Sequence, residues 1–237
     1  MYYGWRAKIG LIIPVNGAAP EYEFHKYAPD GVATLTQRLL FEKVDRTGLV
    51  ALGAQVEDAA RLLAHAGPDL LMFGCTTGSL IKGAGYDAQL CRRMEAAAGG
   101  IPSLTTSTAV LRALKALKAK KVAVATPYSA AVDEAERKFL EDNGFEVLSI
   151  RGLGYTEPNC MPATTFNQMY RLSGEVMCPE ADVLFVSCTG LGVADGIPML
   201  ERDFGVPVVT SNQASLWCAL RALSIRDDVG LGELFRH

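Results

Sequence analysis

The segments Asp69-Leu-Leu-Met-Phe-Gly-Cys75-Thr76 and Asp182-Val-Leu-Phe-Val-Ser-Cys188-Thr189 repeat one pattern at an offset of 113 residues. Each has an aspartate, a short apolar run and then a Cys-Thr pair. A short apolar run bounded in this way is typical of a buried strand in a parallel sheet. We therefore expect two equivalent strands, each with a cysteine at its carboxyl end.

Further matches extend the repeat over most of the chain. Two more pairs have the same offset of 113, and a last pair has an offset of 105: Lys8–Pro14 with Lys121–Pro127, Gly31–Thr36 with Gly144–Ser149, and Ile101–Thr108 with Val206–Gln213. Each match is weak alone, but three in order at one offset indicate an internal duplication.

Apolar runs alternate with helical patterns, which is typical of βα units on a parallel sheet. We expect strands over Ile9–Pro14, Gly31–Leu35, Leu70–Gly74, Ser103–Thr105, Val122–Thr126, Glu146–Ile150, Val183–Ser187 and Pro207–Thr210. We expect helices over Leu52–Ala66, Ala88–Ala98, Ser107–Ala119, Ala130–Asn143, Thr164–Val176, Ile197–Phe204 and Gln213–Leu223.

The predicted fold is α/β, with two pseudo-symmetric halves that are Rossmann-like or flavodoxin-like. Each half has a roughly four-stranded parallel sheet flanked by helices. We expect residues 1–117 to form the first half, completed by the C-terminal segment 213–237, and residues 118–212 to form the second. Ligands of open parallel sheets bind beyond the carboxyl ends of the strands, so the active site is expected in the cleft between the halves.

Composition excludes several classes of protein. The 23 basic and 26 acidic residues give a net charge of -3 without a block of like charge, which argues against a nucleic-acid partner. No apolar run is long enough to span a membrane, and the N-terminus lacks a signal-peptide pattern. We therefore expect a cytoplasmic protein whose six scattered cysteines are free thiols.

Cys75 and Cys188 are the candidate catalytic residues, because the repeat places them on opposite walls of the cleft. A thiolate is a strong nucleophile and a usable base. The turns that follow, Thr76-Thr77-Gly78-Ser79 and Thr189-Gly190, offer hydroxyl and backbone N–H donors that suit a carboxylate or an oxyanion. A free cysteine at a strand end is more often a small buried hydrophobe, but the symmetric pair favours function.

The two Cys-Thr turns, the duplicated halves and Thr126-Pro-Tyr128 resemble the aspartate/glutamate racemase superfamily, most of all its branch of maleate cis-trans isomerases and arylmalonate decarboxylases. The resemblance implies an enzyme without cofactor or metal that acts on a small carboxylic or dicarboxylic acid, and it leaves a homo-oligomer open. It implies Cys75 and Cys188 as the catalytic pair. The substrate-binding residues that it implies are Asn16, Thr76, Thr77, Tyr128, Asn159, Thr189 and Gly190.

The resemblance leaves several functions open. Decarboxylases of this branch keep a glycine where this chain has Cys75, whereas isomerases and racemases have both cysteines. We therefore expect a two-cysteine isomerase or racemase ahead of a decarboxylase that protonates an enediolate through Cys188. A non-catalytic protein that binds a small acid between two lobes is the alternative from another class.

Overall fold

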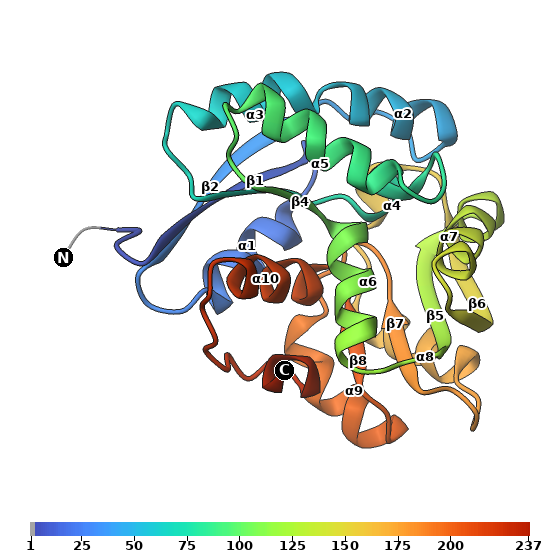
Figure 1. Ribbon diagram of the computed structural model, residues 1–237. Coiled ribbons are helices and arrows are strands. Elements are labelled where there is room, and N and C mark those ends of the chain that lie inside the picture. Colours follow the sequence, from blue (N-terminus) through green and yellow to red (C-terminus); the bar gives the residue numbers. More distant parts are fainter. Residues whose placement is uncertain (1–2) are drawn as a thin grey trace.

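Two four-stranded parallel sheets form the framework of the protein, for which the computed structural model describes residues 3–237 (Figure 1). Their strand orders are β2-β1-β3-β4 and β6-β5-β7-β8, so the two halves have the same topology. The strands are β1 (Ala7–Pro14), β2 (Val32–Leu39), β3 (Leu70–Phe73), β4 (Ser103–Thr105), β5 (Lys121–Tyr128), β6 (Glu146–Tyr155), β7 (Val183–Val186) and β8 (Val208–Thr210).

The strand register confirms the duplication. Ile9 of β1 pairs with Leu70 of β3, and Val122 of β5 pairs with Val183 of β7. Both pairs of partners are related by the offset of 113 residues. The innermost strands therefore superimpose residue by residue, which places the segments after β3 and β7 at equivalent points.

The equivalence also holds at the other end of these strands. The Asp69 carboxylate accepts the backbone N–H of Lys8 at 2.7 Å, and the Asp182 carboxylate accepts that of Lys121 at 2.8 Å. Each aspartate thus satisfies a backbone donor where a central strand begins. Both carboxylates lie at the end of the sheet away from the two cysteines.

The helices follow the expected βα alternation but include three that were not expected. The segment Leu52–Ala66, predicted as one helix, overlaps two helices, α2 and α3, that meet at Gln55. Helices α1 and α4 were not predicted. The helices are α1 (Ala18–Tyr27), α2 (Arg46–Ala54), α3 (Val56–Ala64), α4 (Thr76–Leu80), α5 (Tyr86–Ala97), α6 (Thr106–Ala116), α7 (Ala130–Asp142), α8 (Phe166–Val176), α9 (Ile197–Phe204) and α10 (Ser211–Ala222), with short 3-10 turns η1 (Pro158–Cys160), η2 (Ala194–Gly196) and η3 (Glu233–Arg236).

One hydrophobic core is common to both halves. It includes Leu11 of β1 and Val124 of β5, whereas a second core lies between the first sheet and α2, α3 and α5. Helix α10 packs against α6 (Figure 1). The division of the chain into 1–117 with 213–237, and 118–212, stays a prediction. Among the described residues, no helix is long and apolar enough to cross a membrane.

Candidate active site

Cys75 follows β3 and is the N-cap residue of α4. Its backbone is extended, with φ of −149°, and its Sγ accepts the N–H of Gly78 at 3.4 Å. A Cβ at position 78 would lie 2.9 Å from this sulfur, so only glycine lets the N–H approach in this way. The hydroxyl of Thr77 also favours the thiolate of Cys75 and lowers its pKa, against the effect of burial.

Cys188 occupies the equivalent place after β7, but its backbone differs. Its φ of 125° lies in a region that side-chain-bearing residues rarely adopt. Its Sγ accepts the N–H of Gly190 at 3.3 Å, and its own N–H donates to Ser211 Oγ at 3.0 Å. No α-helix follows directly, because the chain passes through a loop to η2.

Both cysteines line one narrow cavity of about 30 Å³ between the halves. This is about twice the volume that one water molecule needs, so the cavity is narrow in this state. None of the lining residues that the structure describes is charged. They are Pro14, Asn16, Gly17, Phe41, Val44, Cys75, Thr77, Tyr128, Pro158, Met161, Cys188, Thr189 and Gly190.

Hydrogen bonds across the halves hold these walls together. Asn16 Nδ2 donates to the carbonyl of Pro158 at 2.6 Å, and Thr189 Oγ1 donates to the carbonyl of Gly74 at 3.2 Å. The first bond joins the loop after β1 to η1, and the second joins the two cysteine turns. The geometry of the cavity therefore depends on both halves.

Burial governs the ionisation of the thiols. It raises the pKa of Cys75 to about 11 and the pKa of Cys188 to about 12. The hydroxyl of Tyr128 hydrogen-bonds the Cys188 thiol, and burial holds the pKa of Tyr128 well above its usual value. Both cysteines are consequently protonated at neutral pH in this state, and a thiolate forms only when donors or a proton acceptor favour it.

Seven of the nine residues expected at the site line the cavity, and two do not. Thr76 is buried, and its hydroxyl donates to Ser211 Oγ at 2.8 Å, away from the cavity lining. Asn159 is exposed within η1, where its neighbour Pro158 lines the cavity instead. These two positions follow from the first turn of α4 and from the short η1, neither of which was predicted.

Sequence reasoning missed the apolar part of the lining. Phe41 and Val44 come from the loop after β2, and Met161 follows η1. Val44 is only 3% exposed, and its N–H donates to the carbonyl of Thr156 at 3.1 Å. The sequence carries little signal for these residues, because Phe41 continues the apolar run Leu39–Phe41 and only Val44 is isolated among charged residues.

No group of three or more His, Cys, Asp or Glu side chains within residues 3–237 is arranged to hold a metal ion. The cavity lining presents thiols, hydroxyls, an amide and backbone N–H groups. Taken together, the fold and the site define an α/β protein of two repeated halves with a cysteine pair in the cleft between them.

Comparison with known proteins gives the family. A family model described as arylmalonate decarboxylase matches residues 9–235. The chain belongs to this family. It is 32% identical to the arylmalonate decarboxylase of Bordetella bronchiseptica, over 96% of this chain and 95% of that protein. It is 28% identical to the maleate isomerase of Nocardia farcinica, over 97% and 96%.

Solved structures agree with this assignment. A cysteine-to-alanine variant of the maleate isomerase of Pseudomonas putida S16, with maleate, has a TM-score of 0.93 at 22% identity and covers 97% of both chains. A variant of arylmalonate decarboxylase in its liganded form, with a glycine changed to cysteine and a cysteine to serine, has a TM-score of 0.90 at 33% identity, covering 97% of this chain and 98% of that chain. The homologues are thus enzymes, both isomerases and decarboxylases, whose cysteines have been the targets of substitution.

Proposed function

We propose that the protein is a cofactor-independent cis-trans isomerase of a small cis-dicarboxylic acid such as maleate. The observation that carries this proposal is the pair of thiols, Cys75 and Cys188, that line one cavity from equivalent turns of the two halves. Two opposed thiols allow one to bond to carbon while the other handles a proton.

The uncharged lining favours a dicarboxylic acid without an amino group over an α-amino acid. An α-ammonium group buried in this cavity would lack a carboxylate partner among the described lining residues, and unpaired buried charge is costly. Carboxylates, by contrast, can be bound by neutral donors such as the side chains of Thr77 and Thr189 and the N–H of Gly190. We therefore place the isomerase ahead of an amino-acid racemase, in which one thiolate removes the α-proton and the other thiol protonates the opposite face.

The proposed reaction begins when the Cys75 thiol passes its proton to a substrate carboxylate and the resulting thiolate adds to one alkene carbon of maleate; the proton returns to the sulfur after the C–S bond breaks. A C–S bond forms, and the π electron pair moves to the other carbon and its carboxylate as an enediolate. Rotation about the new single bond brings the carboxylates to the trans arrangement. The electron pair then re-forms the double bond and expels the thiolate, which gives fumarate and regenerates Cys75.

Cys188 is assigned the proton-transfer role. Its thiol can donate a proton to the enediolate carbon and remove it again before elimination, so that the net reaction consumes none. Hydrogen-bond donors around the developing charge can each contribute about 3 kcal/mol of transition-state stabilisation. A structure of the Nocardia farcinica enzyme holds a covalently bound succinylcysteine intermediate, in a variant with one cysteine changed to serine. That species supports a thiol addition of this kind.

Decarboxylation of an arylmalonate is the second candidate. The family model and the 32% identical relative carry that name, and Phe41, Val44 and Met161 give the cavity an apolar side. In this reaction the C–C bond to one carboxylate breaks, CO2 leaves, and the Cys188 thiol protonates the enediolate. Decarboxylation does not require Cys75. Because this chain nevertheless has a cysteine at that position, we rank the decarboxylase second.

Proton NMR in D2O separates these candidates. Purified protein is incubated with maleate, aspartate, glutamate and phenylmalonate, beside Cys75→Ser, Cys188→Ser and the control Cys91→Ser, since Cys91 lies in α5 outside the cavity. Conversion of maleate to fumarate that both site variants lose and the control keeps is the expected result. Loss of a carboxylate from phenylmalonate instead, in the wild type and in Cys75→Ser, would transfer the assignment to the decarboxylase. Deuterium at an α-carbon would indicate a racemase, and no turnover with slow labelling of both thiols by iodoacetamide would indicate a binding protein.

A further inference from the structure

A buried carboxylate on α1 reaches across to the second half of the molecule. Glu23 is 7% exposed, and its Oε1 accepts the N–H of Ala194 at 3.0 Å. Its Oε2 accepts Nδ2 of Asn212, in the first turn of α10, at 2.7 Å. Because α1 belongs to the first half of the fold and Ala194 follows β7, this carboxylate joins the two halves.

Asn212 passes the contact on to the loop that carries Cys188. Its Nδ2 also lies within hydrogen-bond distance of the carbonyls of Thr189, at 3.0 Å, and Leu191, at 3.3 Å. The adjacent Ser211 accepts the N–H of Cys188. Glu23 therefore fixes both the end of this loop, at Ala194, and the amide that holds its beginning.

The backbone of Cys188 requires such support. A residue with a side chain held at φ of 125° is strained, and this conformation persists only where the surroundings impose it. The contacts through Ser211 and Asn212 supply that constraint. Without them the backbone would relax toward an ordinary conformation, and the sulfur would leave its position in the cavity.

The internal repeat provides a natural comparison for Glu23. Glu136 of α7 lies 113 residues further along and is also buried. It accepts only the hydroxyl of Ser187, at 2.6 Å, and its Oε2 has no partner among the described atoms. Cys75, the cysteine of the other turn, has an ordinary extended backbone, which needs no such contacts to hold it. The Glu23 network is thus specific to the Cys188 side of the cavity.

We propose that Glu23 is a positioning residue. Its contacts with Asn212 and with the N–H of Ala194, which we call the clamp, hold Cys188 in its strained conformation. The carboxylate form is the one that fits, because both of its oxygens face donors. A proton on either oxygen would oppose one of these N–H groups and weaken the clamp.

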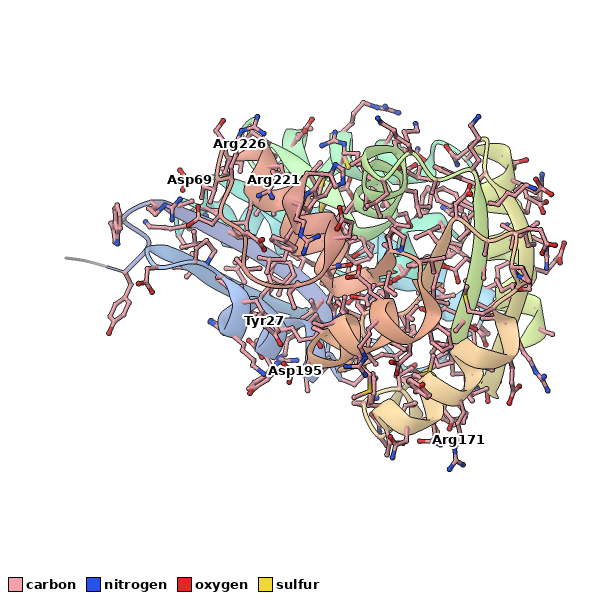
Figure 2. The ribbon with its side chains drawn as sticks, turned by 90° about the horizontal axis from the view of Figure 1, so that it is seen from below. Tyr27, Asp69, Arg171, Asp195, Arg221 and Arg226 are labelled. Atoms are coloured by element: carbon pink, nitrogen blue, oxygen red, sulfur yellow. The ribbon has the colours of Figure 1, made fainter. Side chains whose placement is uncertain are left out.

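The charged groups near Glu23 that the structure describes are paired with one another rather than with Glu23. Asp195 of η2 is held by Lys26 Nζ at 2.6 Å and by the hydroxyl of Tyr27, and Tyr27 and Asp195 lie close together in Figure 2. From β2, Arg38 pairs with Glu21 on α1, and α10 presents the neutral Asn212. Burial raises the pKa of Glu23 to about 7. The charge of Asp195 acts in the same direction, and the hydrogen bonds from Ala194 and Asn212 act against it. The clamp is therefore expected to weaken as pH falls through about 7.

Thiol alkylation tests this role without a substrate. Iodoacetamide labelling is followed by peptide mass spectrometry, and the rate at Cys188 is divided by the rate at Cys75 in the same molecules. Local opening governs the reaction of buried groups, so Glu23→Gln should raise this ratio about tenfold at neutral pH. The matched control Asp87→Asn changes a buried carboxylate of α5 that is not among the groups acting on either thiol, and it keeps an acceptor for Thr108. It should leave the ratio within about twofold of wild type.

The pH profile separates positioning from a merely structural role. Between about pH 5.5 and pH 7.5, the wild-type ratio should rise as pH falls, because protonation of Glu23 releases the loop, whereas the ratio in Glu23→Gln should be flat. The wild-type profile can be measured even if Glu23→Gln folds poorly, so the proposal can still be tested without the variant. A flat wild-type ratio, or equal acceleration at both cysteines in Glu23→Gln, would overturn the proposal.

The catalytic importance of the clamp rests on the proposed function, in which Cys188 transfers the proton. If maleate is isomerised, Glu23→Gln should lower kcat about tenfold with little change in KM. Failure of the isomerase proposal would remove only this kinetic readout, since the alkylation ratio is measured without any substrate. The two proposals can therefore fail separately.

Discussion

The turns of Cys75 and Cys188 begin from the same strand position and then diverge. Cys75 is extended, caps α4 and accepts the backbone N–H of Gly78. Cys188 has a strained backbone, faces Tyr128 and is held in place by contacts from α10 and α1. Duplication thus provided two equivalent thiols, and local structure gave them different surroundings. Each thiol has one hydroxyl, of Thr77 or Tyr128, and one backbone N–H, of Gly78 or Gly190, that favour its thiolate. The two turns therefore differ in backbone conformation and in the contacts that support it, not in the donors around the sulfur.

Removal of either sulfur should have the largest effect. Cys75→Ser and Cys188→Ser are each expected to lower kcat at least about 10³-fold, because an alcohol is a far weaker nucleophile and acid at neutral pH. Cys91→Ser should keep wild-type activity. The proton NMR assay measures all three variants, with circular dichroism to verify that each is folded. A site variant that retains more than a tenth of the activity would contradict the division of labour.

Tyr128→Phe should have the next largest effect, and it probes only the Cys188 side. Loss of one preorganised donor typically costs about 10²-fold in kcat. The hydroxyl is buried beside Cys188, so the pH at which that thiol ionises should also rise, since a hydrogen bond that favours the thiolate is lost. Measurement of kcat and of Cys188 alkylation against pH tests both effects. An unchanged kcat would show that Tyr128 serves only packing.

Glu136→Gln tests the energetic cost of a buried carboxyl that accepts the hydroxyl of Ser187, the residue before Cys188. Burial raises the pKa of Glu136 to about 8. The unfolded chain ionises near pH 4.5 and the folded protein does not, so wild-type stability is lost as pH rises from about 4.5 toward 8. The variant should equal wild type near pH 4.5 and exceed it by about 3 kcal/mol at pH 7. Urea unfolding at the two pH values gives the comparison, and a variant that is less stable at pH 7 would contradict it.

Gly78→Ala should produce the smallest catalytic effect, on the Cys75 side. The new methyl group would lie 2.9 Å from Cys75 Sγ and displace the sulfur, so kcat should fall about tenfold. Gly174→Ala in α8 is the matched control, because its nearest contact would be the Phe204 ring at 3.8 Å. Turnover and thermal unfolding of both variants are measured together. Equal kcat in the two variants would mean that the close approach at position 78 does not position the thiol.

The internal repeat made most of the fold predictable. A shared offset fixes which strands are equivalent, and the pairing of Ile9 with Leu70 repeats as Val122 with Val183. The missed helices lack the signals on which such prediction depends. Helix α1 is largely polar and contains Pro20, α2 contains two glycines, and α4 has only five residues.

The candidate site was predictable only where it follows strand ends. Cys75, Cys188 and their neighbours could be placed because parallel strands end at one edge of a sheet. The hydrogen bond from Asn16 to Pro158, and the inward position of Phe41, depend on how the two halves pack together. Thr76 lies outside the cavity lining because the first turn of α4 directs its hydroxyl toward Ser211. Such long-range contacts leave no local pattern in the sequence.

Intact-protein and peptide mass spectrometry after incubation with maleate tests the central claim most directly. In Cys188→Ser the adduct can form at Cys75 but is not efficiently resolved, so the mass of one maleic acid should be added to the peptide that contains Cys75. Cys75→Ser should acquire no such adduct under the same conditions. An adduct on Cys188 in the Cys75→Ser variant, with none on Cys75 in the Cys188→Ser variant, would reverse the assigned roles and contradict the account.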